Sequence, residues 1–268
     1  MKRSFILLPI LLLASVAYAA PGPALAGLTE FKVELPRELR LMAGRGHLSP
    51  VRHALVTIAA PANMEMASGV PVLIISATSD PPYNSSRRLL AAYAETALEA
   101  GWVLVAADPA EEIDVEQDDV AMRLALNTAA LAVLRRQWPS AGRGGLAFGG
   151  FSGGAKYSGW LAVAFSNQGS AVVGIYLAGI NSDTVISAAE HFKVLNADFK
   201  RIPIFLQYGD DDTVATPADH RQVRKELMRA GFGNVRIEGF RGAHEINPAP
   251  LRKALDWFRE AAGLSAMK

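Results

Sequence analysis

The feature that most constrains the fold is a series of short, almost wholly apolar runs that alternate with amphipathic stretches. The clearest runs are VPVLIISA (70–77), WVLVAAD (102–108), GLAFGG (145–150), AVVGIYLAG (171–179) and IPIFLQYG (202–209). Continuous apolarity indicates strands that are covered on both faces, which is typical of a parallel sheet between helices. The sequence therefore predicts an α/β fold with a doubly wound, mostly parallel sheet.

The stretches between these runs carry helical signals at their ends. In NSSRRLLAAYAETALEAG, apolar residues recur at helical spacing after Asn84 or Ser85, either of which is a candidate N-cap. In TPADHRQVRKELMRAG, Thr216 is the predicted cap and Pro217 takes the first helical position. Three more helices are predicted at about 117–138, 155–165 and 251–262.

The pattern is different before residue 70. FKVELP (31–36), LRLMAG (39–44) and VRHALVTIAAP (51–61) follow one another without an obvious helix. We expect them to form antiparallel edge strands that lead into the parallel part of the sheet.

The first 19 residues have the pattern of an export signal. Lys2 and Arg3 precede an apolar stretch, and Ala17-Tyr18-Ala19 offers small residues for cleavage. The apolar stretch is shorter than the roughly 20 residues that a spanning helix needs. We therefore expect residues 1–19 to be removed, and the protein to be periplasmic or secreted without a membrane span.

Residues 20–268 are expected to form a single domain, because a chain of this size can bury about three quarters of its unfolded surface in one core. The whole sequence has 27 basic and 26 acidic residues and no cysteine. This charge balance gives no electrostatic footprint for nucleic acid. The lack of cysteine excludes disulfides, thiolate metal sites and a cysteine nucleophile.

One hydroxyl lies between two pairs of glycines in GGFSGGAK (149–156), where the predicted strand must turn sharply into a helix. This segment contains the G-x-S-x-G pattern of a nucleophile elbow, a strained turn that exposes the serine oxygen. Gly150 and Gly154 relieve the steric collision expected on either side of Ser152. The N–H of Gly153 opens the helix and is a candidate oxyanion donor.

The same glycines do not fit a phosphate-binding loop. A P-loop needs G-x-x-x-x-G-K-[ST], but Ala155 separates Gly154 from Lys156 and Tyr157 follows. A Rossmann fingerprint would need a glycine in place of Phe151. No nucleotide, metal or organic cofactor is expected.

A serine nucleophile requires a base and an acid, which follow it in the order serine, acid, histidine in this kind of fold. Four histidines lie in N-terminal strands, before the best acidic residues or within a helix: His47, His53, His191 and His220. His244, just after the final predicted strand VRIEGF (235–240), is therefore the predicted base. The acid is expected among the aspartates of GDDDTV (209–214), with Asp210 and Asp212 as the candidates.

Together, GFSGGAK, GDDDTV and GAHE on alternating strands and helices resemble the α/β-hydrolase superfamily over nearly the whole mature chain. GFSGGAK is most similar to the exported esterase branch near dienelactone hydrolases and polyhydroxyalkanoate depolymerases. The resemblance implies about eight strands with helices on both faces, and it favours Asp212 because G-x-x-D before Thr-Val resembles that superfamily's acid turn. Only 181–201 has room for a lid, so little or no cap is expected.

Several substrate-facing residues stay open. The usual His-Gly after the third strand of the superfamily is absent here, so the second oxyanion donor is the N–H of Ala77 or of Thr78. Tyr83 and Asn84 are candidate pocket residues or simple turn residues, and Lys156 is a candidate contact for an anionic substrate or a solvated lysine.

The sequence thus predicts an exported serine hydrolase that acts on a small or polymeric carboxylic ester through an acyl-enzyme. Two alternatives stay open: a peptidase of the same superfamily, and a noncatalytic binding protein on the same scaffold.

Overall fold

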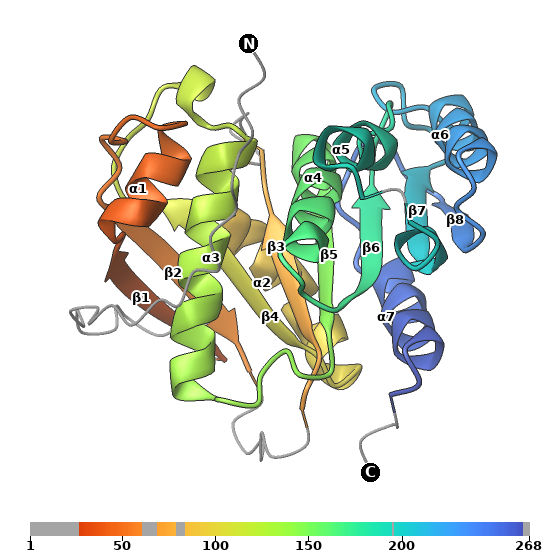
Figure 1. Cartoon of the computed structure of the whole chain (residues 1–268). Coiled ribbons are helices and arrows are strands. Elements are labelled where there is room, and N and C mark those ends of the chain that lie inside the picture. The colour runs from red at the N-terminus through yellow and green to blue at the C-terminus, as the bar shows by residue number, and fades with distance from the viewer. Residues whose placement is uncertain (1–26, 61–68, 79–83, 195, 265–268) are drawn as a thin grey trace.

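The computed structural model describes residues 27–60, 69–78, 84–194 and 196–264. One sheet of eight strands runs through it, with the spatial order β1-β2-β4-β3-β5-β6-β7-β8 (Figure 1). The strands are β1 Leu28–Glu34, β2 His53–Ala59, β3 Val72–Ser76, β4 Val103–Pro109, β5 Leu146–Phe151, β6 Val172–Ala178, β7 Ile204–Gly209 and β8 Val235–Phe240. β2 is antiparallel to β1 and to β4, and every other neighbouring pair is parallel. The predicted mostly parallel sheet of about eight strands is confirmed.

Helices cover both faces of this sheet. They are α1 Arg37–Ala43, α2 Ser86–Glu99, α3 Val120–Gln137, α4 Gly153–Asn167, α5 Val185–Phe192, α6 Pro217–Arg229 and α7 Ala249–Ala261, with short 3-10 helices at Val115–Gln117 and Phe199–Arg201. α2 and α7 bury apolar residues on one face, and the other α-helices do so on the opposite face.

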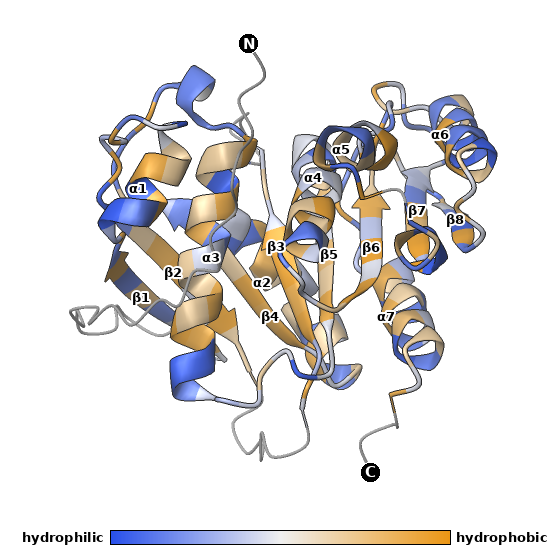
Figure 2. Cartoon of the chain, in the orientation of Figure 1, coloured by the Kyte–Doolittle hydropathy of each residue, from blue (hydrophilic) through white to orange (hydrophobic). Residues whose placement is uncertain are grey.

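The central strands explain why their sequences are apolar throughout. In β3, Val72 and Ile74 pack into the core beneath α3 and α4, whereas Leu73 and Ile75 pack into the core beneath α2 and α7. Successive side chains of a strand point to opposite faces, so both sets are buried. Figure 2 shows hydrophobic residues concentrated along these strands and mixed character on the surrounding helices.

The prediction of a strand at LRLMAG (39–44) is wrong, because α1 lies there. β1 pairs with β2 over its full length, from Leu28 opposite Ala59 to Glu34 opposite His53, so no third strand fits between them. Leu39 and Ala43 are one helical turn apart, and both are buried in the core that α1 shares with α3. The period of four residues fits a helix better than a strand.

The N-termini of α2 and α6 have the side-chain caps that the sequence predicts. Ser85 caps α2, where its side chain accepts the N–H of Arg88. Thr216 caps α6 in a reciprocal capping box with Asp219, and Pro217 is the first helical residue.

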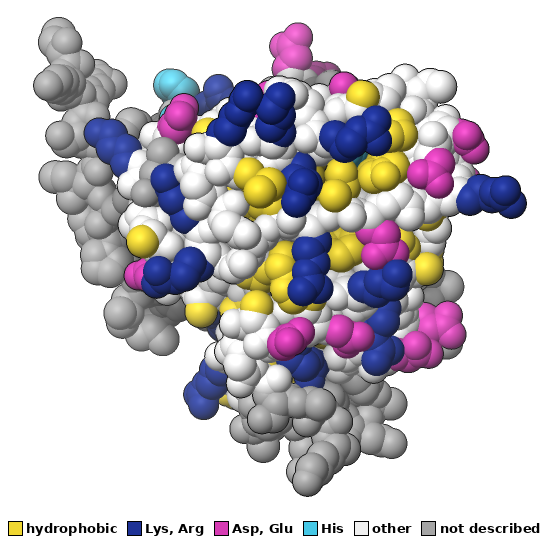
Figure 3. Space-filling model, turned by 90° about the vertical axis from the view of Figure 1, so that its right-hand side faces the viewer, with side chains coloured by type: hydrophobic (Ala, Val, Ile, Leu, Met, Phe, Trp, Pro, Cys, Tyr) yellow, Lys and Arg dark blue, Asp and Glu magenta, His cyan; other side chains and the backbone are white. Residues whose placement is uncertain are grey.

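The connection from β6 to β7 is the segment with room for a lid. It contains α5, which packs against α4, and the 3-10 helix Phe199–Arg201. At the far edge of the sheet, α6, β8 and α7 form a face on which basic side chains lie beside hydrophobic ones, with acidic side chains among them (Figure 3).

The predicted signal at 1–19 lies outside the described residues. Among the helices of the described ranges, none has the length and apolar character that crossing a membrane would require.

Candidate active site

Ser152 lies at the tip of the turn that joins β5 to α4. Its backbone has φ 55° and ψ −122°, a conformation that L-residues rarely adopt. Such a conformation costs on the order of 1 to 3 kcal/mol and persists only where the surrounding structure imposes it. One such contact is a hydrogen bond of 2.8 Å from the Ser152 N–H to the carbonyl of Ala178 in β6.

The flanking glycines are required by close backbone contacts. A Cβ atom added to Gly150 would lie 2.4 Å from the carbonyl carbon of Gly154, and one added to Gly154 would lie 2.1 Å from the carbonyl oxygen of Ser76. The end of β3 therefore passes directly against the turn. This arrangement matches the elbow geometry that the sequence predicts.

The structure brings His244 to Ser152 from the loop after β8. Nε2 of His244 lies 3.0 Å from Oγ of Ser152, and Nδ1 lies 2.8 Å from Oδ2 of Asp212. An ionised carboxylate can only accept a hydrogen bond, so Nδ1 of the neutral imidazole carries the hydrogen and Nε2 accepts the hydrogen bond from the serine hydroxyl. This is the arrangement of a nucleophile, a base and an orienting acid.

Asp212, rather than Asp210, is the aspartate that contacts His244. Its Oδ1 accepts the N–H groups of Val214 and Ala215, both at 2.8 Å, which leaves Oδ2 directed at the histidine. Burial alone would raise the pKa of Asp212, but these hydrogen bonds outweigh burial and lower the pKa below its usual value. Asp210 is exposed.

The imidazole of His244 packs against Phe151 at the end of β5 and lies beside Gly179, the residue after β6. Its ring lies 4.6 Å from the ring of Phe151, measured between centroids. Gly179 follows β6 with φ 62°, and a Cβ atom there would lie 2.8 Å from Phe151 and 3.1 Å from Cε1 of His244. The glycine at this position allows the chain to pass beside the histidine.

The two predicted oxyanion segments lie against each other. Gly153 is the first residue of α4, where backbone N–H groups lack helical acceptors, and a Cβ atom there would lie 2.7 Å from the Thr78 side chain. The Ala77 N–H already donates to Oγ of Ser86 at 3.2 Å, so Ala77 is not suited to binding an oxyanion. Thr78 is the alternative whose side chain lies against Gly153.

The three predicted substrate residues differ in their location and exposure. Tyr83 lies outside the described residues, and Asn84 is exposed just before the cap of α2. Lys156 is half-buried in the first turn of α4, and its N–H donates to the carbonyl of Ser152.

Two buried polar residues near the site were not singled out from the sequence as functional. His220 in α6 is one of them. Its Nε2 accepts the N–H of Ile180 at 3.1 Å and its Nδ1 donates to the carbonyl of Thr216 at 3.0 Å, which is the pattern of a neutral imidazole. Arg123 in α3 is the other, and its signal in the sequence is a charged residue within an apolar helix. Within the described ranges, no cluster of three or more metal-ligating side chains occurs.

No protein-family model and no curated protein matches this chain. Solved structures do match. A cold-adapted esterase from an Arctic intertidal metagenomic library has 15% identity and a TM-score of 0.57, and the match covers 91% of this chain and 99% of that one. A serine hydrolase without a lid from Xanthomonas campestris has 17% identity and a TM-score of 0.55, with coverage of 82% and 93%.

A peptidase is also among the structural neighbours. The acylaminoacyl peptidase of Pyrococcus horikoshii has 13% identity and a TM-score of 0.53. The match covers 87% of this chain but 44% of the peptidase chain. At such identities the likeness establishes a shared fold, and the chemistry has to be argued from the site itself.

Proposed function

We propose that this chain, which has the α/β-hydrolase fold, is a serine hydrolase that cleaves carboxylic esters. The observation that carries the proposal is the continuous contact from Asp212 through His244 to Ser152 on a strained turn. A serine hydroxyl is a weak nucleophile, and an adjacent base that is itself oriented by an acid activates it.

In the proposed reaction, Oγ of Ser152 attacks the acyl carbon while Nε2 of His244 takes the hydroxyl proton. Asp212 stabilises the imidazolium that forms and keeps Nδ1 protonated. The N–H groups of Gly153 and Thr78 bind the negative oxygen of the tetrahedral intermediate. His244 then protonates the departing alcohol, which leaves an acyl-enzyme.

The second half of the reaction uses the same groups. His244 removes a proton from water, and the resulting nucleophile attacks the acyl carbon. The proton then returns from His244 to Oγ of Ser152 as the carboxylic acid leaves. Nothing in this cycle requires a cofactor.

We favour esters over peptides as the substrate class, because the match covers 99% of the esterase chain but only 44% of the peptidase chain. Turnover of p-nitrophenyl acetate and butyrate should therefore exceed that of aminoacyl nitroanilides. The Ser152→Ala variant should lose ester turnover by about 10⁴-fold or more. Rapid anilide turnover without ester turnover would identify a peptidase. No turnover of either by the folded protein would favour a binding protein.

Export is proposed on the charge and apolar pattern of residues 1–19. When the full chain is expressed in a bacterial host, we expect a periplasmic or secreted product whose first residue is Ala20. A product that keeps Met1 and stays in the cytoplasm would contradict this assignment.

A further inference from the structure

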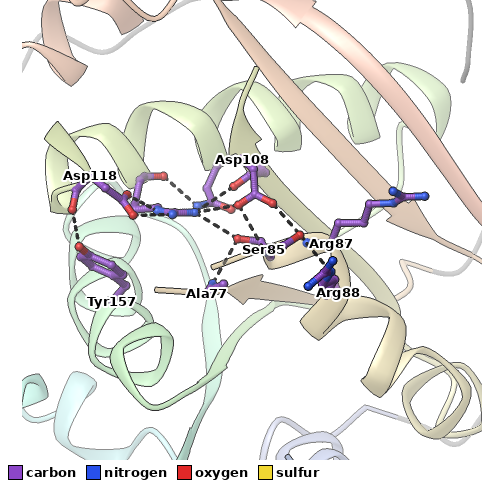
Figure 4. A network of polar contacts seen from close by, with 11 residues as sticks. Ala77, Ser85, Arg87, Arg88, Asp108, Asp118 and Tyr157 are labelled. Carbon is purple, nitrogen blue, oxygen red and sulfur yellow. Dashed lines mark hydrogen bonds and ion pairs between the residues drawn. The ribbon is translucent and has the colours of Figure 1, made fainter. Parts of the chain in front are cut away.

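Figure 4 shows a network of polar contacts that includes Ala77, Asp108, Asp118 and Tyr157. The centre of this network is Arg123 in α3. Its Nε and Nη2 donate to the two carboxylate oxygens of Asp118 at 2.5 and 2.6 Å. Its Nη1 donates to Oδ1 of Asp108 at 3.0 Å and to Oγ of Ser86 at 3.1 Å. The side chains of Arg123 and Asp118 are 3% and 1% exposed, so this is a buried ion pair.

A buried ion pair of this kind contributes little net free energy to folding. Removing two charges from water costs several kcal/mol, and apolar side chains of similar volume often replace a buried pair without loss. The planar guanidinium does, however, fix the direction of each of its hydrogen bonds.

On one side, the network holds the end of β3. Oγ of Ser86 accepts both the guanidinium of Arg123 and the N–H of Ala77, which lies at 3.2 Å. Asp108 accepts the N–H groups of Ser86 and Arg87 and thereby anchors the start of α2. Ala77 immediately precedes Thr78, a predicted oxyanion donor whose side chain lies against Gly153.

On the other side, the network holds the nucleophile helix. The hydroxyl of Tyr157 in α4 donates to the carbonyl of Asp118, and the Tyr157 ring lies 5.7 Å from the guanidinium carbon of Arg123. Tyr157 is on the second turn of the helix that Gly153 opens. The two chain segments that carry the predicted oxyanion donors are thus joined through Arg123 and its hydrogen-bond partners Ser86 and Asp118.

We propose that Arg123 is a positioning residue that sets the separation between Thr78 and Gly153, and so the width of the oxyanion site. The proposal rests on the serine hydrolase function proposed above. A misplaced donor weakens binding of the transition state more than binding of the ground state. Loss of the network should therefore lower kcat while KM stays nearly constant.

Two variants test this proposal. The measured quantities are kcat, KM and the inhibition constant of a transition-state analogue, which a purely structural role of Arg123 would not change in this pattern. Ser86→Ala removes the acceptor of the Ala77 N–H, and Arg123→Met removes the guanidinium at similar volume. Loss of a whole oxyanion donor lowers kcat by about 10² to 10³, so displacement of one should lower it about 10- to 100-fold. KM should change less than about 3-fold, and the inhibition constant of phenylboronic acid, which forms a tetrahedral adduct, should rise as kcat/KM falls.

The matched control is Arg259→Met in α7. Arg259 is also a buried arginine, but its Nη2 donates to the carbonyls of Ala100 and Gly101 at the far end of α2. This variant should be destabilised yet keep the wild-type kcat. If Arg123→Met does not fold, Ser86→Ala still decides the question.

The proposal is overturned if Ser86→Ala keeps the wild-type kcat and boronate affinity, if KM alone changes, or if Arg259→Met loses kcat equally. In each of these cases the wild-type enzyme still hydrolyses esters. A wild-type protein with no turnover and no boronate binding would instead refute the hydrolase function, and the positioning role with it.

Discussion

Ser152 has an unusual backbone for a residue with a side chain, and its neighbours explain how that conformation is maintained. Gly150 and Gly154 approach too closely for any side chain, and the Ser152 N–H is held by Ala178 in the adjacent strand. In this conformation Oγ lies 3.0 Å from Nε2 of His244. Glycines on both sides of one hydroxyl made this residue predictable from sequence.

The residues alone limited the candidates for the triad acid to Asp210 and Asp212, but they did not decide between the two. Asp210 and Asp212 are two positions apart in the same turn, and only the folded turn directs Val214 and Ala215 to one of them. The second oxyanion donor was open for a similar reason. The partner of the Ala77 N–H is Ser86, which approaches it only once α2 has packed onto the sheet.

Replacing Asp212 tests the assignment of the acid. Asp212→Asn keeps the shape of the side chain but removes the charge that holds Nδ1 of His244 protonated. We expect kcat to fall by about 10⁴-fold. Asp210→Asn, at the exposed aspartate, should stay within about 3-fold of the wild type, since distant surface changes have small effects. Equal losses in the two variants, measured with p-nitrophenyl butyrate, would contradict the assignment.

At the scale of elements, sequence periodicity predicted the parallel strands and five of the α-helices, but it missed α5 and assigned a strand where α1 lies. Seven residues give too few turns for an amphipathic pattern to stand out, and Leu39 and Ala43 are apolar for contacts with α3, which is distant in sequence. The network of Arg123 was also beyond prediction. Asp118 lies five residues before Arg123, but Asp108 and Ser86 belong to other segments that reach Arg123 only in the fold.

His220 joins α6 to the segment after β6, and this junction should respond to pH. Burial lowers the pKa of His220, although the nearby Asp212, Asp219 and the carbonyl of Thr216 favour the charged form. The unfolded state, with a pKa of about 6.5, then takes up the proton first as pH falls. The His220 contribution is therefore present above about pH 6.5 and is lost as pH falls through the folded pKa.

Urea unfolding at about pH 8 and about pH 5 measures this contribution. His220→Gln should flatten the pH dependence of the free energy of unfolding by about 1.4 kcal/mol for each unit of pKa difference. His47→Gln, at an exposed histidine, is the control and should keep the wild-type slope. Identical slopes for all three proteins would contradict the burial argument.

At the scale of the whole molecule, the sheet depends on helices being seated on both faces. α7 packs its apolar residues against β6, where a Cβ atom on Gly174 would lie 2.2 Å from the ring of Phe258. Because α7 follows the loop that carries His244, its seating also bears on the site. The composition and the apolar runs predicted both covered faces, but not which residues meet across them.

Gly174→Ala should therefore lower the free energy of unfolding by roughly 1 to 3 kcal/mol through overpacking. Gly233→Ala is a matched control, since no atom lies within 4 Å of the added Cβ there. That variant should stay within about 0.5 kcal/mol of the wild type. A urea midpoint for Gly174→Ala equal to that of Gly233→Ala would show that α7 does not pack on β6 as described.

Labelling with a fluorophosphonate probe, followed by mass spectrometry, tests most directly whether Ser152 is an activated nucleophile. We expect one adduct per folded chain, on the peptide that contains Ser152, and a large fall in labelling rate in His244→Ala. Failure to label the folded protein, or equal labelling of Ser152→Ala, would contradict the account.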